Sequence, residues 1–566
     1  MNSKRLLAHY ASIADAPDAI VSLRRFILDL AVRGKLVPQD PKEGSATDLL
    51  KRIWEEKAQL AKAGRIRTLE EPLTAGADGL PFDLPGGWRC ARLGDVVTKL
   101  TDGTHHSPPN ERSGDFKYIT AKNIKDDGIS LTNVTYVSRG VHEEIYARCN
   151  PQKGDILYIK DGATTGVVTI NDLDEPFSML SSVALLKLPS CLSNKLIVVF
   201  LRSPFFYDQM RGFMKGAAIT RVTLKRMAPA LIPIPPLAEQ HRIVAKVDEL
   251  MTLCDRLEAA RAEREVTRDR LAASSLACLN APDPETFQGD ARFVLNVLPA
   301  LTTRPDQIKL LRETILNLAV RGELVPRDPK DEPATELLRR IGMDRARLDR
   351  KERGKRRPSG LSGDAQLFHL PSGWAVAPLA DLVSVLNGRA YKQSELLSAG
   401  TPVLRVGNLF TSDKWYYSDL QLEEDKYCDT GDLLFAWSAS FGPFIWAGKK
   451  VIYHYHIWKL SLHSEAELDK LYLYDFLLQK TREIKESGHG ISMIHMTKEK
   501  MEKLQVPVPP LAEQRRIVAK VNELMTLCDR LEASLTTCDD TRRRLLDALL
   551  AEALAPGEPR EMEAVA

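Results

Sequence analysis

One long segment occurs twice in this chain. Residues 235–259 and 509–533 are identical at 23 of 25 positions. A second pair, residues 23–53 and 311–341, is identical at 21 of 31 positions and has an offset of 288. Self-similarity of this length predicts a fold built from two copies of one unit. The offset falls to 274 at the first pair, so the copies differ mainly in the segment between the repeats.

Each half of the chain therefore has three parts. A helical lead-in comes first, an unlike middle segment second, and a near-identical helix last. The middle segment begins at a shared motif, "LPGGW" ending at Trp88 and "LPSGW" ending at Trp374. A chain of 566 residues is also too long for a single hydrophobic core.

The last helix of each half has an apolar stripe with alternating spacings of four and three residues. That spacing is typical of a coiled-coil seam, and an amphipathic helix packed on a globular core is the alternative. Prolines before Leu237 and Leu511 prevent an earlier start. We expect the two helices to pair with one another, antiparallel, and to act as rigid spacers. The stripe residues are Ile243, Val247, Leu250, Cys254 and Leu257 in the first copy, and Ile517, Val521, Leu524, Cys528 and Leu531 in the second.

The middle segments contain short apolar runs that end in turn residues, which predicts strands. The fold class is therefore α+β: two globular mixed α/β domains, separated by long paired, coiled-coil-like helices, with an internal duplication and pseudo-twofold symmetry. The predicted strands lie within 116–124, 154–162, 165–170 and 181–188 of the first half and within 402–410 and 431–439 of the second. The predicted divisions are 1–82, 83–236, 237–282, 283–365, 366–510 and 511–566.

Composition limits the environment and the partners. No apolar run is long enough to cross a membrane, and the start lacks a signal-peptide core, so we expect a cytoplasmic protein with no membrane partner. Eight scattered cysteines without CxxC pairs agree with a reducing compartment. The net charge of +3 means that a polyanion site has to be local. The basic run at 350–358 is such a candidate, although a solvated linker is the simpler interpretation.

Enzyme signatures are missing from the sequence. No GxxxxGK[ST] phosphate loop, strand-following GxGxxG, HExxH or GxSxG occurs. Every Pro-Pro pair lies outside the Asn/Asp-Pro-Pro-aromatic pattern of amine methylation. We therefore expect a chain without catalytic residues, resident metal or bound cofactor.

A rigid spacer that carries two similar folds with unlike surfaces suits a rigid ligand with two different sites. Duplex DNA is such a ligand, since half-sites a helical turn apart need fixed spacing. The order of "LAVRGKLVPQDP", "LPGGW" and "PLAEQHRIVAKVDEL", with their copies, resembles the specificity subunits of type I restriction-modification systems. This resemblance covers essentially the whole chain.

The resemblance implies two target-recognition domains, in the middle segments, on a non-catalytic subunit that binds double-stranded DNA. It implies assembly with two methyltransferase subunits and two motor-nuclease (restriction) subunits. S-adenosylmethionine, ATP and Mg would then belong to those partners. The rival hypothesis is a protein-binding scaffold, in which the duplicated helices dock two identical proteins.

Polar loops of the middle segments are the candidate DNA contacts, because Arg, Lys, Asn and Gln match base edges while Lys, Arg, Ser and Thr match phosphates. For the two loops after the first strands, plain surface loops are an equally good interpretation, and His105–His106 lacks the further ligands of a metal site. The candidates in the first half are Thr104, His105, His106, Lys122, Asn123, Lys160, Thr164, Thr165, Lys215 and Arg221. Those in the second half are Arg389, Tyr391, Lys392, Arg405, Asn408, Ser438, Ser440, His489 and His495.

Two further features have competing interpretations. Asn123 and Asn408 are aligned, and such an Asn often shapes a turn instead of contacting a ligand. Glu239 and Glu513 recur in both helices, where they would dock a repeated partner or keep the helix soluble.

Overall fold

The computed structural model describes residues 9–66, 80–211, 221–280, 285–351, 370–410, 412–438, 441–487 and 496–555. The chain divides into two compact units. The first unit comprises Met1–Glu263 and Cys538–Ala566, and the second comprises Arg264–Thr537. Residues 352–358 of the basic run, with the candidates Lys215, Ser440, His489 and His495, lie outside the described residues.

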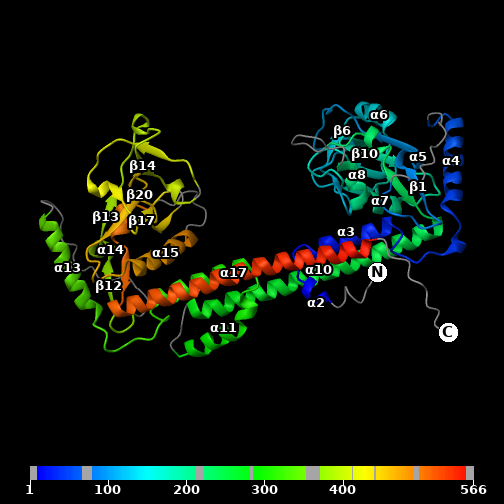
Figure 1. Ribbon diagram of the computed structural model, residues 1–566. Coiled ribbons are helices and arrows are strands. Elements are labelled where there is room, and N and C mark those ends of the chain that lie inside the picture. Colours follow the sequence, from blue (N-terminus) through cyan, green and yellow to red (C-terminus); the bar gives the residue numbers. More distant parts are fainter. Residues whose placement is uncertain are drawn as a thin grey trace, which may run out of the picture. The chain divides into compact units, whose positions relative to one another are not determined.

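Two helices of 44 residues, α10 (Leu237–Asn280) and α17 (Leu511–Leu554), begin directly after the paired prolines (Figure 1). In the first unit the stripe of α10 packs on the lead-in helix α3 (Ala19–Val32), where Ile243 and Val247 share a core with Ile27 and Leu28. The opposite side of α3 packs on the last turns of α17, through Phe26, Leu30, Leu546, Leu549 and Leu550.

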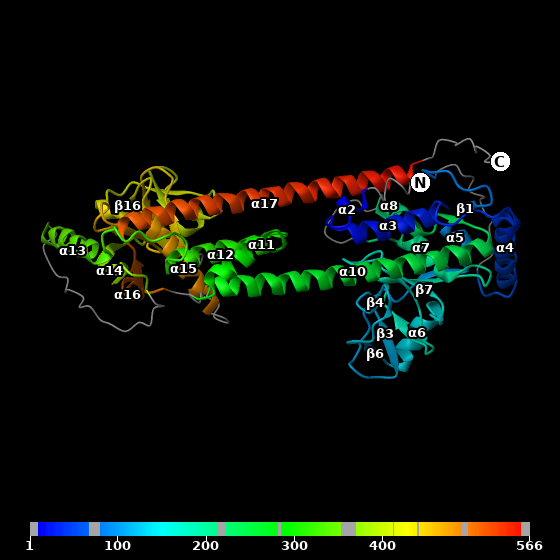
Figure 2. The same ribbon diagram turned by 90° about the horizontal axis from the view of Figure 1, so that it is seen from below.

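The second unit repeats this arrangement with α12 (Pro305–Arg321) in the place of α3. Ile308 and Ile315 of α12 share a core with Ile517 and Val521 of α17. The end of α10 packs on α11 (Phe287–Leu301) and on Leu311 of α12. Within each unit the lead-in helix lies between the two long helices (Figure 2). The predicted association of the long helices is therefore made through a third helix in each unit.

Matching ion pairs accompany these two packings. Arg24 of α3 donates to Asp255 and Glu258 of α10, at 2.7 Å each. The equivalent Arg312 of α12 donates to Asp529 at 2.7 Å and Glu532 at 3.1 Å. Because these ion pairs are partly exposed, they add little to stability. Their main effect is to fix how each lead-in helix is aligned along its long helix.

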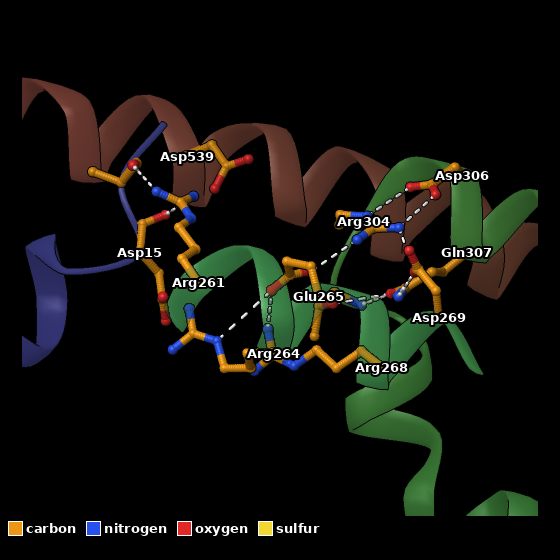
Figure 3. Close-up of polar contacts among 12 residues, drawn as sticks. Asp15, Arg261, Arg264, Glu265, Arg268, Asp269, Arg304, Asp306, Gln307 and Asp539 are labelled. Atoms are coloured by element: carbon orange, nitrogen blue, oxygen red, sulfur yellow. Dashed lines mark hydrogen bonds and ion pairs between the residues drawn. The ribbon is translucent and has the colours of Figure 1, made fainter. Parts of the chain in front are cut away.

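The second unit has an additional polar cluster where α12 begins (Figure 3). Arg304 donates to Glu265 at 2.8 Å, to Asp269 at 2.5 Å and to Asp306 at 3.0 Å. These hydrogen bonds raise the pKa of Arg304 further above its ordinary value and fix the start of α12 on the end of α10. Ala16 occupies the equivalent position in the first unit, where Arg261 instead donates to the Ala16 carbonyl at 3.2 Å.

The repeated sequence motifs meet at one joint in each unit. Gly34 follows α3 with a φ of 64°, and a Cβ there would lie 2.5 Å from Pro85. Trp88, 2% exposed, donates from Nε1 to Glu239 at 3.0 Å, and Gln39 donates to the same carboxylate at 2.6 Å. In the second unit Gly322, Pro371 and Trp374 repeat the close packing.

Neither surface interpretation of Glu239 and Glu513 is correct, because each is only 2% exposed. Burial raises the pKa of both carboxyls. The neighbouring Gln240 accepts from the Ser193 N–H at 3.1 Å, as Gln514 does from Asp469 at 2.8 Å. The near-identical helix starts thus anchor the lead-in and the middle segment together.

Residues 88–234 and 374–508 form two α/β domains, the first domain and the second domain. In the first, a ribbon β1–β11 (Arg89–Arg92, Leu231–Ile234) joins the domain to its scaffold. An antiparallel sheet of order β2-β10-β7-β8 forms the core, and a second sheet of order β6-β3-β9 contains a parallel β3–β9 pair. The bounds are β2 Lys99–Asp102, β3 Phe116–Ile119, β4 Ile124–Lys125, β5 Gly128–Ile129, β6 Thr135–Val137, β7 Ile156–Ile159, β8 Val168–Ile170, β9 Ser178–Met179 and β10 Val183–Lys187.

The second domain repeats the ribbon, the four-stranded sheet and the parallel pair, adds β16 to its other sheet and, among the described residues, has no counterpart of the β4–β5 pair. Its ribbon is β12–β21, its antiparallel sheet is β13-β20-β17-β18, and its other sheet is β15-β14-β19-β16 with a parallel β14–β19 pair. This confirms the predicted mixed α/β duplication. The bounds are β12 Ala375–Pro378, β13 Val383–Asn387, β14 Thr401–Leu404, β15 Tyr416–Ser418, β16 Tyr427–Cys428, β17 Leu433–Ala436, β18 Gly442–Ile445, β19 Val451–Tyr453, β20 Ile457–Leu462 and β21 Gln505–Val508.

Helices cover these sheets and connect them to the scaffold. The remaining helices of the first unit are α2 Tyr10–Ile13, α4 Ala46–Lys62, α5 Leu93–Val96, α6 Arg139–Arg148, α7 Asn194–Arg202, α8 Pro204–Arg211 and α9 Leu224–Met227. Those of the second unit are α13 Ala334–Lys351, α14 Leu379–Leu382, α15 Lys470–Ser487 and α16 Lys498–Glu502.

Candidate nucleic-acid interface

Strand ends bring four loops together in the first domain. Thr104, after β2, makes a parallel bridge to Leu180, after β9. The Ala121 N–H, after β3, donates to the Ser182 hydroxyl at 3.4 Å, and the Lys160 N–H, after β7, donates to the Ser182 carbonyl at 2.9 Å. We call this meeting of residues 103–106, 120–123, 160–166 and 180–182 the first loop surface.

A buried carboxylate organises this surface from below. Asp102 is 3% exposed and lies 3.2 Å from the Lys160 ammonium, which is 2% exposed. Arg148 of α6 also donates to Asp102, and the His105 ring lies 3.4 Å from the same carboxylate. Lys160 therefore lies beneath the surface in an ion pair, whereas His105 and Arg148 reach the solvent side. An unpaired charge at this depth would be strongly unfavourable, so the cluster holds the two β-strand ends in place.

A groove of about 790 Å³ opens beside these loops. Hydroxyl and amide side chains dominate its lining, with Lys122 and Lys125 as cations. Tyr118 lies in the groove wall, 2% exposed, and its hydroxyl has no hydrogen-bond partner among the residues that the structure describes. Burial raises the pKa of Tyr118 to about 12, so the hydroxyl stays a neutral donor. Such a groove presents donors and acceptors at close spacing, as base-edge reading requires.

The other candidates of the first domain have distinct roles in the structure. Thr104 shapes its own loop, since its hydroxyl and the His106 backbone exchange hydrogen bonds at 3.1 and 3.3 Å. Thr165 donates to the Gly162 carbonyl at 2.7 Å, while Thr164 and His106 are exposed. Arg221 is exposed and lies 3.5 Å from Asp161.

Asn123 and Asn408 have the same local geometry. The Asn123 amide oxygen accepts from the Thr120 N–H at 3.0 Å and its amide nitrogen donates to the Ser130 carbonyl at 3.1 Å. Asn408 accepts from the Arg405 N–H at 3.1 Å and donates to the Lys414 carbonyl at 3.0 Å. These bonds favour the turn-shaping interpretation of both residues.

The second domain forms its own loop surface from the equivalent strand ends. Arg389, after β13, bridges His454, after β19, and the Trp437 N–H, after β17, donates to the His456 carbonyl at 3.2 Å. We call residues 388–392, 405–408, 437–438 and 454–456 the second loop surface. The strand pairing makes Lys160 and Trp437 equivalent, and likewise residues 180–182 and 454–456.

Aromatic rings replace the buried ion pair here. The Trp437 ring lies 5.0 Å from His456, 6.0 Å from Tyr455 and 5.8 Å from Trp458. Burial, then the neighbouring His456 and Arg405, lower the pKa of His454 to about 4, so this ring is neutral near pH 7. Half-buried Ser438 follows Trp437 in the same loop.

Cations flank the rings. Arg389 donates to Glu395 at 2.8 Å and lies 5.4 Å from the Tyr391 ring. Burial raises the pKa of Tyr391 to about 12. Arg405 is exposed above the Tyr416 ring at 5.1 Å, and Lys392 is exposed at the rim.

Sequence reasoning missed several residues of these surfaces. Arg148 lies 43 positions from His105 and only the fold brings them to 3.1 Å. Tyr118 was hidden within a predicted strand. His454, Tyr455 and His456 had a usable signal, since "YHYH" at 453–456 places rings at the end of a buried strand.

No cluster of three or more His, Cys, Asp or Glu suited to a metal ion occurs among the described residues. Within that same part of the chain, no helix is both long and apolar enough to span a membrane.

This architecture and sequence match those of known proteins. The model of the type I restriction modification DNA specificity domain matches residues 85–268 and 371–537. The EcoAI specificity subunit of a type I restriction enzyme from Escherichia coli is 27% identical, over 94% of this chain and 93% of its own length. The EcoEI specificity subunit, also from Escherichia coli, is 28% identical, over 94% of each.

A solved structure agrees with the fold. A chain from work on complex assembly and conformational transition of the type I R-M system superposes with a TM-score of 0.51. It is 20% identical, and the match covers 84% of this chain and 99% of that one. With two matched copies of the domain spanning more than half its length, the chain belongs to the family of type I restriction-modification specificity subunits.

Proposed function

We propose that this chain reads an asymmetric, bipartite DNA sequence, with one half-site bound by each loop surface. The observation that carries this proposal is the chemical difference between two surfaces built on equivalent strand ends. The first is rich in hydroxyls and amides around a buried ion pair, and the second is rich in rings. Unlike side chains on the same backbone frame support recognition of unlike bases.

Exposed cations at both surfaces would contact phosphates and fix the register on the duplex. In the first domain these are Lys122, Lys125, Arg148 and Arg221, and in the second Lys392 and Arg405. Lys160 and the two asparagines would position the loops, because their polar atoms are already paired.

The chain would be the non-catalytic member of its complex. Its relatives are named as specificity subunits of type I restriction enzymes, which supports a place in such a complex. From the family resemblance we expect two methyltransferase and two motor-nuclease subunits as its partners. The methyltransferases would flip one adenine in each half-site, because a stacked base is out of chemical reach. The lengths of α10 and α17 would set the gap between half-sites.

Salt dependence of DNA binding tests the proposal against the scaffold alternative. The complex of this chain with its methyltransferase partner should bind duplex DNA with an affinity that falls about 10³-fold between 50 and 200 mM salt, as six phosphate contacts require. A scaffold that docks proteins only would show no DNA affinity beyond that of the methyltransferase alone.

A further inference from the structure

The turn after β19 exposes a tyrosine on a rigid support. Tyr455 is 39% exposed, at the tip of the turn between β19 and β20. Its backbone is held twice: its N–H donates to the Arg389 carbonyl at 3.0 Å, and its carbonyl accepts from Trp437 Nε1 at 2.8 Å. The His456 ring lies 3.9 Å away and supports the tyrosine ring from one side.

The equivalent turn of the first domain has the same backbone frame and no ring. There the Ser181 N–H donates to the Thr104 carbonyl at 2.8 Å, as the Tyr455 N–H does to Arg389. The Tyr455 ring contacts Trp437, His454 and His456 of the same loop surface, and the residue is still 39% exposed. An exposed aromatic of this kind, flanked by cations, is suited to stacking on a nucleic-acid base.

We propose that Tyr455 stacks on a base in the second half-site and opens a base step there. The second half-site is then selected partly by how easily that step unstacks, whereas the first is selected by hydrogen bonds. This inference rests on the proposed DNA-reading function. Trp437 and His456 are the positioning residues that keep the ring upright, and Arg405 is placed to contact the adjoining phosphate.

The test uses the complex with the methyltransferase partner and a duplex carrying its mapped site. Tyr455→Phe keeps the ring and should bind within about twofold of wild type. Tyr455→Ala should lose about 5- to 100-fold, the usual value of one base–aromatic stack. Trp54→Ala, which removes a 40% exposed ring of α4 outside both loop surfaces, is the control and should change the affinity by less than about threefold.

A second measurement distinguishes stacking from a hydrogen bond by the hydroxyl. Single mismatches are placed through the second half-site, outside the methylated adenine. A mismatch lowers the cost of unstacking a base. At one position of the half-site, the mismatched duplex should therefore bind the wild-type complex and the Tyr455→Phe complex more tightly than the matched duplex does. The Tyr455→Ala complex should show no such gain in affinity.

Three results would overturn the inference: equal losses for Tyr455→Phe and Tyr455→Ala, full affinity for Tyr455→Ala, or a mismatch gain that Tyr455→Ala retains. Failure of the proposed function is separate, since the wild-type complex would then show no preference for a bipartite site over a scrambled duplex.

Discussion

The two domains bring equivalent strand ends together on different supporting side chains. In both, a glycine lets the end of one strand approach the end of a parallel pair, at Gly103 and Gly388. Beneath that approach the first domain buries Asp102 and Lys160, while the second has exposed Asn387 and half-buried Trp437 at the equivalent positions. The comparison teaches that both domains keep one backbone frame at these strand ends, whereas the side chains around each loop surface differ.

The buried ion pair should be the most sensitive point of the first domain. Lys160→Met leaves Asp102 with Arg148 and the His105 ring and should lower the free energy of unfolding by about 3 kcal/mol. The double variant Asp102→Asn, Lys160→Met removes both charges, as the second domain does, and should recover at least half of that loss. Urea unfolding measures both, and a double variant no more stable than the single one would refute the role of this pair.

Adding a methyl group at the shared glycines should come next. A Cβ at Gly103 would lie 1.9 Å from the Met179 carbonyl oxygen, and one at Gly388 would lie 2.4 Å from that of His454. Because backbone has to move, Gly103→Ala should cost about 2–3 kcal/mol, and Gly388→Ala somewhat less. Gly140→Ala, which meets nothing within 4 Å and lies in α6, is the control and should not lower the unfolding midpoint.

A buried carboxylic acid in α15 of the second unit has no counterpart at the equivalent position of α7 in the first. Asp475 of α15 is 8% exposed and aligns with Val199 of α7, and burial raises the pKa of its carboxyl to about 7. The raised pKa means that stability falls as pH rises from about 4 to 7, where the folded state must lose the proton. Asp475→Asn should therefore stabilise the protein on the order of 2 kcal/mol at pH 8.

The same substitution should give almost no gain near pH 4, where Asp475 is protonated in the folded state. Melting curves at the two pH values measure the difference. An equal gain at both would show that the benefit comes from packing and not from the charge.

The smallest expected effect concerns His454. Its pKa of about 4 in the folded state lies below that of an exposed histidine, so stability should fall slightly as pH drops from about 6.5 toward 4. Leu180 stands at the equivalent position, so the corresponding turn of the first domain contributes no such dependence. An NMR titration of the His454 ring should show a midpoint near 4, and a midpoint near 6.5 would contradict its buried environment.

Much of the fold could be predicted because the repeated segments indicate where each unit and each long helix begins. Proline stops and the apolar stripes predicted α10 and α17, and the shared motifs predicted two similar units. The stripe did not reveal its partner, since a four–three spacing fits a long helix and a lead-in helix equally well. Only the fold shows that Ile243 packs on α3 and Ile517 on α12.

The loop surfaces were harder to predict, because side-chain roles there depend on depth. Lys160 is of a residue type that often contacts phosphate, but it lies in a buried ion pair. No local pattern in "IKDGATTG" indicates that burial. Glu239 is of a residue type usually found at the surface, but its carboxylate accepts a hydrogen bond from Trp88, which lies in a motif 151 positions away. Residues whose partners are distant in sequence need the fold before their chemistry can be assigned.

The most direct test of the central claim is a map of methylated adenine. This chain and its methyltransferase partner would be expressed in a host without other DNA methylation, and the genome sequenced for the modified base. The account predicts one split motif, with two unlike short halves around a fixed gap. A palindromic motif would contradict it, because two surfaces of different chemistry would then read the same bases. Absence of methylation by a stable complex would contradict DNA reading itself.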